Sequence, residues 1–360
     1  MSCKIKKNIR PSANLENFRS MLYLSHGIAL NRLPLIVFVV GLAVSTAKGQ
    51  DLHFSQPYLQ PGWQSPALFG VFTGDWRAAF TYRSQWPTVP VAYRTLAGST
   101  GHKLWRNRSG VLSAGLLLAQ DQAGDAGLKW SQAGVTSAFT HALSARHAMT
   151  LGFSASGVQR RVDLSRLTFK NQWDGDIYNP SLPSKETLEQ QSPVQISLAA
   201  GLNWHWVKSA DERTGIDAGL SWQHLNKPQV HFRDDRPFEL PVRHQGYIQG
   251  YWQQSGALDY TGFSQITRMG RALDVISGAG MRYWLQEAVA AQFTLAARWK
   301  DALIPAVQLQ WDQWTVGLSY DMNVSKFKIA TQRQGGLEVS VIYTATPVKA
   351  IKEPKVCPIF

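Results

Sequence analysis

Apolar and polar residues alternate along several long segments of the chain. In residues 194–206, VQISLAAGLNWHW, every second residue from Val194 to Trp206 is apolar, and the residues between them are small or polar. The same alternation runs through residues 216–223, 316–325 and 337–343. A period of two places successive side chains on opposite faces of a strand. These segments are therefore predicted to be β-strands with one apolar and one polar face.

The predicted strands are long. Several reach about ten residues, whereas strands of soluble proteins usually have about five or six. A tilted strand of about nine to eleven residues crosses a bilayer. Aromatic residues such as Trp222, Trp284 and Trp311 gather toward the strand ends, where a membrane barrel places its aromatic girdles. We therefore predict an all-β fold, a transmembrane antiparallel β-barrel, with a secreted β-sandwich as the alternative.

The same pattern gives a strand count of about 14. Thirteen strands are predicted near residues 75–86, 109–120, 132–141, 147–159, 194–207, 214–225, 244–254, 257–268, 272–285, 290–299, 305–311, 313–325 and 336–344. Bacterial single-chain barrels have an even number of strands, so a further strand is predicted near residues 161–170. Two polar stretches, residues 171–193 and 226–243, are predicted to be surface loops.

The first 49 residues have the pattern of a leader. Six basic residues precede the 12-residue apolar run Leu33–Val44, and Ala47-Lys48-Gly49 follows it. This order is typical of a secretory signal peptide, and the run is shorter than the roughly 20 residues of a transmembrane helix. We predict a signal peptide over residues 1–49, cleaved near Gly49-Gln50; a short membrane anchor is the alternative. Either Met1 or Met21 is the start.

Charge and cysteine content narrow the function classes. The leader contains seven Lys or Arg and one Glu, so its removal lowers the formal net charge from +13 to +7. The remaining charge is dispersed, which argues against a nucleic-acid partner. Only 17% of residues are charged, below the roughly one quarter of soluble domains. The two cysteines, Cys3 and Cys357, exclude a disulfide framework and a Cys-rich zinc site.

Residues 346–360 differ from the predicted barrel of residues 50–345. They contain Pro347, Pro354 and Pro358 among three lysines, and proline is excluded from central strands. We predict a C-terminal periplasmic tail, with a disordered end as the alternative.

The chain shows no pattern that indicates catalysis. The nine histidines are scattered without metal-ligand spacing, and pairs such as Asp174 and Asp176 fit Asx turns better than a calcium loop. G-x-S-x-G and phosphate-loop motifs are absent from the sequence. We therefore predict a protein that is not an enzyme, with no catalytic residue, cofactor or metal site.

Several short motifs, in order along residues 50–360, resemble those of the PorP/SprF family. They include QDLHFSQPY at 50–58, SPALFG at 65–70, YRSQWP at 82–87, GLSYDMNVSK at 317–326, GGLE at 335–338 and CPIF at 357–360. The motif residues predicted to have structural or partner-contact roles are Phe54, Ser55, Gln56, Pro66, Ala67, Gly70, Arg77, Tyr82, Arg83, Gln85, Trp86, Tyr320, Asp321, Ser325, Gly336, Glu338, Cys357 and Pro358.

This resemblance implies an outer-membrane β-barrel of the type IX secretion and gliding-motility machinery. Its implied partners are outer-membrane lipids and either periplasmic ring lipoproteins or a secreted surface adhesin. An outer-membrane porin or small-molecule channel is the alternative function, because a barrel of this size can enclose an aqueous lumen. Ionised residues on a barrel strand face the lumen or a partner, so we expect Asp321 to pair with a lumen arginine.

Overall fold

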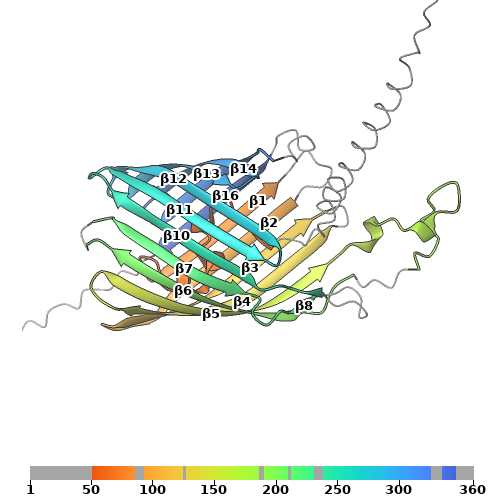
Figure 1. Cartoon of the computed structure of the whole chain (residues 1–360), viewed down its shortest axis with the longest axis horizontal. Helices are drawn as coiled ribbons and strands as arrows, with labels where there is room; N and C mark the ends of the chain where they lie inside the picture. Colours follow the sequence, from red (N-terminus) through yellow and green to blue (C-terminus); the bar gives the residue numbers. More distant parts are fainter. Residues whose placement is uncertain are drawn as a thin grey trace, which may run out of the picture. The chain divides into compact units, whose positions relative to one another are not determined.

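The computed structural model describes residues 51–85, 93–124, 127–185, 190–209, 212–230, 238–325 and 335–345. Fourteen antiparallel strands form one closed barrel (Figure 1). The predicted all-β transmembrane barrel fold and the predicted number of strands are both confirmed. The predicted leader and tail lie outside the described residues.

The strands of the barrel run up and down in sequence order. They are β1 (Trp76–Gln85), β2 (Tyr93–Arg106), β3 (Gly110–Ala123), β4 (Leu128–Ala142), β5 (His147–Arg161), β6 (Gln195–Val207), β7 (Gly215–Gln223), β10 (Arg243–Gln253), β11 (Leu258–Met269), β12 (Ala272–Gln286), β13 (Val289–Arg298), β14 (Ala302–Trp311), β15 (Trp314–Asn323) and β16 (Gly336–Ala345). Two short strands, β8 (Gln229–Val230) and β9 (Phe238–Glu239), form a separate sheet between β7 and β10.

The barrel closes where the first strand meets the last. β1 pairs with β16 over its whole length, from Trp76 opposite Ala345 to Gln85 opposite Gly336. β1 also pairs with β2 on its other side. Closure removes the free backbone edges that an open sheet would expose.

The prediction of a strand near residues 161–170 was wrong. β5 ends at Arg161, and short 3₁₀ turns at 164–166 and 170–172 belong to a loop. The fourteenth strand is β2, which the pattern analysis missed. Its outward positions include Arg94, Gly98 and Thr100, so the alternation of large apolar side chains is weak in β2.

The outer face of the barrel is apolar and the inner face is polar. In β15, Leu318 and Tyr320 are 44% and 37% exposed outward, while Ser319 and Asp321 face inward and are buried. Exposed aromatic residues, including Trp76, Trp311 and Trp314, lie at strand ends. An apolar outer face with aromatic ends fits a lipid bilayer. No helix within the described ranges is long and apolar enough to cross a membrane.

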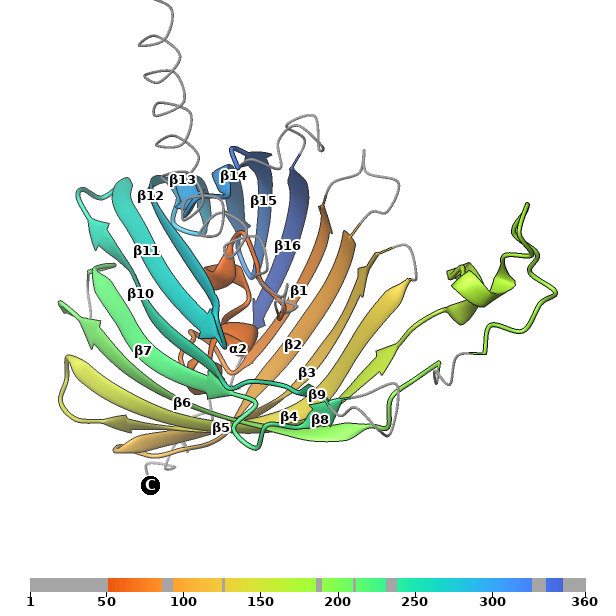
Figure 2. The same ribbon diagram turned by 45° about the vertical axis from the view of Figure 1, so that its right-hand side comes forward.

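The two ends of the barrel differ in the length of their connections. At the end where β1 begins, strands are joined by short turns such as residues 287–288 and 312–313; we call this the short-turn end. At the opposite, long-loop end, residues 162–194 and 224–242 form longer connections, and the first of these projects away from the strands (Figure 2). Bacterial barrels have short periplasmic turns and longer extracellular loops, so we expect the short-turn end to face the periplasm.

Candidate functional site

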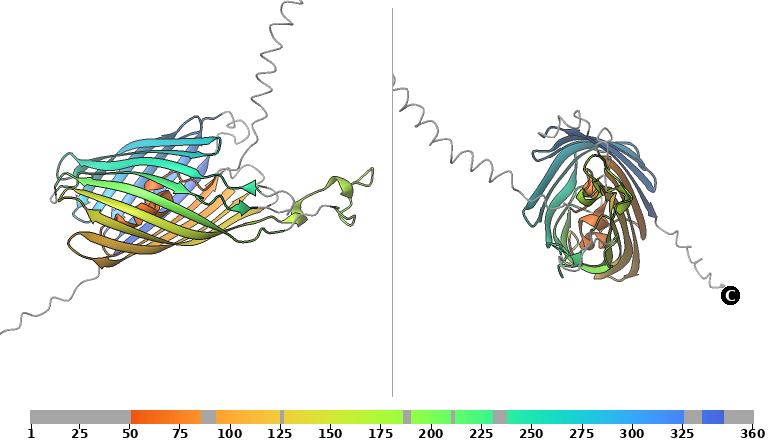
Figure 3. Two further views of the ribbon diagram at one scale, coloured as in Figure 1. Left: turned by 60° about the horizontal axis from the view of Figure 1, so that its bottom comes forward. Right: turned by 90° about the vertical axis from the view of Figure 1, so that its right-hand side faces the viewer.

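The segment before β1 folds inside the barrel. Residues 51–75, which we call the plug, contain three short helical turns: η1 (Pro57–Leu59), α2 (Pro61–Gln64) and η2 (Pro66–Gly70). Figure 3 shows this orange segment within the ring of strands. Each turn begins with proline, which suits the first position of a helix. The pattern analysis assigned this segment to the barrel domain but did not predict that it fills the lumen.

Apolar residues of the plug form one of the buried clusters of the protein. Phe54, Trp63 and Phe69 pack against inward-facing barrel residues, among them Ala97 and Leu117. Burying such large side chains contributes about 1.5–3 kcal/mol each by transfer from water. The part of the lumen beside β2 and β3 is therefore filled with packed side chains.

Glycines in the barrel wall allow the plug to lie close to the strands. A Cβ atom on Gly152 of β5 would overlap the backbone of Pro66 and Ala67. A Cβ atom on Gly317 of β15 would overlap Leu59. Gly317 therefore provides room for the plug.

A buried ionic cluster holds the start of the plug. Arg83 of β1 stands opposite Glu338 of β16, and its Nη2 donates to Asp321 Oδ2 of β15 at 2.7 Å. The expected pairing of Asp321 with a lumen arginine is thus confirmed. The backbone N–H groups of Ser55 and Gln56 donate to the two Glu338 carboxylate oxygens at 2.7 and 2.8 Å, and Ser55 Oγ donates to Asp321.

Two arginines bind carbonyl groups of the same plug residues. Arg83 Nη1 donates to the His53 carbonyl at 2.6 Å, and Arg298 Nη2 donates to the Phe54 carbonyl at 3.1 Å. Residues 53–56 therefore have both backbone donors and backbone acceptors engaged by charged wall residues. Hydrogen bonds to charged groups are about twice as strong as neutral ones.

The first described residue of the plug is held at the long-loop end. Asp51 Oδ2 lies 3.0 Å from Arg243 Nη1 and 3.3 Å from His224 Nε2, and all three side chains are buried. Burial alone would raise the pKa of Asp51, but Arg243 and His224 outweigh it, so the pKa lies well below its usual value. Removal from water and the neighbouring Arg83 lower the pKa of His53 well below its usual value.

The structure brings most of the predicted motif residues to the plug or its contacts. Arg77 of β1 donates to the carbonyls of Leu68 and Val71 at 3.0 and 3.3 Å. The motif residues of the plug itself are Phe54, Ser55, Gln56, Pro66, Ala67 and Gly70, all buried.

Five further motif residues within the described ranges lie outside the plug itself. Tyr82 and Tyr320 occupy outward positions of β1 and β15. Gln85 stands opposite Gly336 where β1 and β16 meet. Ser325 follows β15 and bonds to Asn323. Trp86, Cys357 and Pro358 lie outside the described residues.

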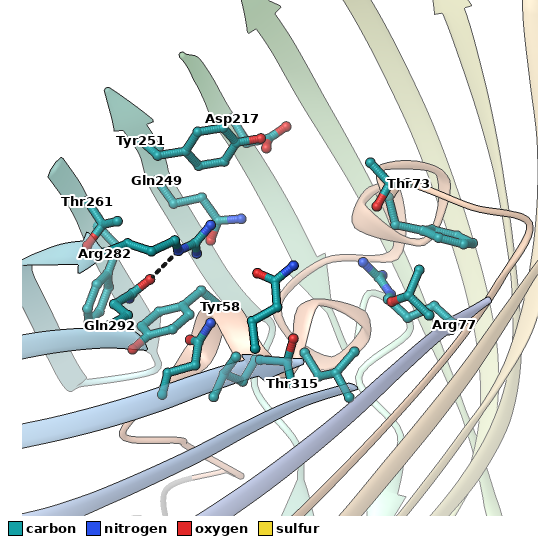
Figure 4. Close-up of a pocket in the computed structure, with 18 of the residues that line it drawn as sticks. Tyr58, Thr73, Arg77, Asp217, Gln249, Tyr251, Thr261, Arg282, Gln292 and Thr315 are labelled. Carbon is teal, nitrogen blue, oxygen red and sulfur yellow. Dashed lines mark hydrogen bonds between the residues drawn. The ribbon is translucent and has the colours of Figure 1, made fainter. Parts of the chain in front are cut away.

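A cavity of about 530 Å³ with polar and apolar lining residues lies between the plug and the strands, and we call it the luminal cavity. Figure 4 shows Thr73 and Arg77 on one side of the cavity and Tyr58, Tyr251 and Arg282 on the other. The cavity reaches the short-turn end, because residues 312–313 of the β14–β15 turn line it. Across the described ranges, no group of three or more His, Cys, Asp or Glu residues could hold a metal ion.

The comparison with protein families decides the identity of this plugged barrel. Residues 46–343 match the model of the type IX secretion system membrane protein PorP/SprF. The chain belongs to the PorP/SprF family. A closed barrel with a lipid-facing exterior and this family membership place the protein in the outer membrane. No curated protein matches the sequence.

Solved structures with a similar fold are distant in sequence. The toluene transporter TbuX of Ralstonia pickettii is 10% identical, with a TM-score of 0.49 over 82% of this chain and 95% of that chain. The Pseudomonas putida toluene transporter TodX is 6% identical, with a TM-score of 0.49 over 81% and 93%. The translocator domain of autotransporter NalP from Neisseria meningitidis is 9% identical, with a TM-score of 0.40 over 81% and 95%.

Proposed function

We propose that this PorP/SprF member is a closed, non-enzymatic outer-membrane scaffold of type IX secretion and gliding motility. In this proposal it docks periplasmic ring lipoproteins or a secreted surface adhesin. The observation that supports it is the plug, whose residues 53–56 are bound on both sides by buried charged groups of the wall. A porin needs an aqueous path, and the plug occupies that space.

The ionic contacts explain why the plug stays in place. A hydrogen bond to a charged group contributes about 1.5–3 kcal/mol to stability. Undocking the plug would separate Ser55 and Gln56 from Glu338 and expose the Arg83–Asp321 pair. The resting state of the barrel is therefore closed.

The proposed docking surface is the short-turn end together with the tail. Arg108 in the β2–β3 turn and Arg146 in the β4–β5 turn are exposed there. The tail of residues 346–360 follows β16 and is proposed to extend this surface on the periplasmic side. In the same proposal, signal peptidase removes residues 1–49 before the barrel is inserted.

A pull-down with charge variants tests the docking role. Tagged protein is extracted from outer membranes in detergent, and the captured proteins are identified by mass spectrometry. We expect ring lipoproteins or one large adhesin with the wild type, and clearly less with the R108E/R146E variant. The matched control is K170E/K185E, which reverses two exposed lysines at the long-loop end. Equal capture by both variants would contradict docking at the short-turn end.

Deleting residues 347–360 tests, in the same pull-down, whether the tail contributes to partner binding. We expect weaker capture of the partner, with the barrel still folded and inserted. Unchanged co-purification would remove the tail from the docking surface while leaving the turns in place.

The channel alternative is tested by electrical recording in a planar bilayer. We expect no steady open conductance from the wild-type protein, because the plug fills the lumen. A steady open pore, together with a pull-down that recovers no partner, would replace the scaffold proposal with a porin or small-molecule channel.

A further inference from the structure

Three polar residues that line the luminal cavity each carry a buried side-chain atom without a partner. Gln249 Oε1 of β10, Thr261 Oγ1 of β11 and Gln308 Oε1 of β14 line it and have no hydrogen-bond partner among the described residues. The Gln308 side chain belongs to a residue that is only 8% exposed. A buried polar group without a partner carries a free-energy penalty, which turning the side chain toward a hydrogen-bonding ligand in the cavity would remove.

One cation in the cavity is available to a ligand. Arg282 of β12 points into the cavity, and its Nε donates to Gln292 Oε1 at 2.9 Å (Figure 4). Its two terminal nitrogens have no hydrogen-bond partner in the described part of the chain. A guanidinium with two free nitrogens can bind a carboxylate through two parallel hydrogen bonds.

The nearby carboxylates do not cancel this cation. Asp259 is paired with Arg213 at 3.1 Å, and Asp312 is exposed at the β14–β15 turn. Asp217 accepts hydrogen bonds from Asn203 at 2.9 Å and lies 2.9 Å from His205 Nδ1. Its carboxylate is therefore already engaged by wall residues. On another side of the cavity the rings of Tyr58 and Phe263 pack with centroids 4.9 Å apart, giving an aromatic surface beside the amides and hydroxyls.

We propose that the luminal cavity binds a small acidic sugar. Sugar hydroxyls both donate and accept, so they can pair with Gln249, Thr261 and Gln308 whichever way each amide is oriented. The carboxylate binds Arg282, and the apolar face of the sugar ring packs on Tyr58 and Phe263. The site opens at the short-turn end and is independent of the docking role.

Two other ligand classes fit the cavity less well. An inorganic anion such as phosphate satisfies Arg282 but has few donors for the three unpaired atoms. An extended peptide is commonly bound by adding a strand to a free sheet edge, and the closed barrel has no such edge. The sugar acid satisfies the cation, the unpaired polar atoms and the aromatic surface together.

Calorimetric titration of the full barrel in detergent tests the proposal. The probe is cellobiouronic acid, and cellobiose is its neutral counterpart with the same ring pattern. We expect the acid to bind at least about tenfold more tightly than cellobiose, and this advantage to disappear in R282Q. Q308L is expected to weaken both sugars. The matched control R106Q, an exposed arginine at the same end that does not line the cavity, is expected to bind both like the wild type.

Three results would overturn the proposal. One is no detectable binding of cellobiouronic acid to wild-type protein that retains the heat-dependent gel shift of a folded barrel. Another is undiminished binding to R282Q. The third is displacement of the acid by phosphate or triglycine at equal or lower concentration, which would indicate a simple anion or peptide site. None of these results changes the pull-down that tests docking.

Discussion

At the scale of single residues, the closed state depends on a few buried charges. Arg83, Asp321 and Glu338 come from three strands that meet at the barrel closure, and together they bind residues 53–56 of the plug. The same residues therefore connect the first strand to the last two and the plug to the wall. Substitutions here should affect the plug and the barrel together.

Arg83→Gln is expected to destabilise the barrel by about 3–5 kcal/mol, because it leaves Asp321 and Glu338 buried without their cation. The double variant R83Q/D321N should recover part of this loss, since one uncompensated carboxylate is removed. Denaturant unfolding in detergent measures the free energy of unfolding of both variants. The control is R94Q, an exposed arginine on β2. Equal losses for R83Q and R94Q would show that the cluster has no special role.

Acidification is expected to loosen the plug through His53. Its folded pKa lies well below 6.5, so below that value the undocked state binds more protons and docking weakens as pH falls. Asp51 acts in the same direction but only below its ordinary value of 3.8, because its folded pKa is lowered. Proteolysis of the plug should therefore speed up between about pH 7.5 and about pH 5. An equally steep change in H53Q would exclude His53 as the cause.

At the scale of elements, the plug and the wall are matched in shape. The three proline-initiated turns bring compact backbone against the strands, and glycines such as Gly152 and Gly317 leave room for it. A glycine in a strand usually weakens it, so its presence opposite the plug indicates a close approach of backbone. The plug is held by shape as well as by charge.

Gly152→Ala is expected to displace η2, because the new methyl group overlaps the backbone of Pro66 and Ala67. Overpacking of this kind costs about 1–3 kcal/mol. Hydrogen–deuterium exchange of residues 61–70 should become faster. The control is G98A, where the nearest atom to the added carbon is the Ala79 carbonyl oxygen at 3.8 Å. Unchanged exchange in G152A would mean that the plug does not depend on this contact.

At the scale of the whole molecule, a barrel with a lumen wide enough for a plug is expected to become a pore when the plug is removed. Fourteen strands enclose more space than the eight whose interior side chains fill the lumen. The protein thus has the wall of a channel and the interior of a closed scaffold.

Deletion of residues 52–72 is expected to give an open conductance in planar bilayers, while the wild type stays closed. The control is deletion of residues 172–182, which belong to the projecting loop at the long-loop end. If the 52–72 deletion variant still inserts as a folded barrel but shows no conductance, other segments must also block the lumen.

The class of fold, the lipid-facing surface and the family can all be predicted from the amino-acid pattern. These depend on local information, namely the period of two, the strand length and short motifs such as residues 54–56. The pattern analysis missed β2, because small and polar residues at outward positions weaken the alternation there. The three prolines between 57 and 66 signalled an irregular segment, but not its location.

The plugged lumen and the residues that hold the plug become visible only in the folded protein. Ser55 and Glu338 are 283 residues apart in the chain and meet only because β16 closes on β1. Asp321 could be assigned a lumen partner from its inward position, but Arg83 could not be chosen among the arginines without the strand order. Periodicity fixes which face a side chain occupies, whereas partners across the lumen depend on closure and register.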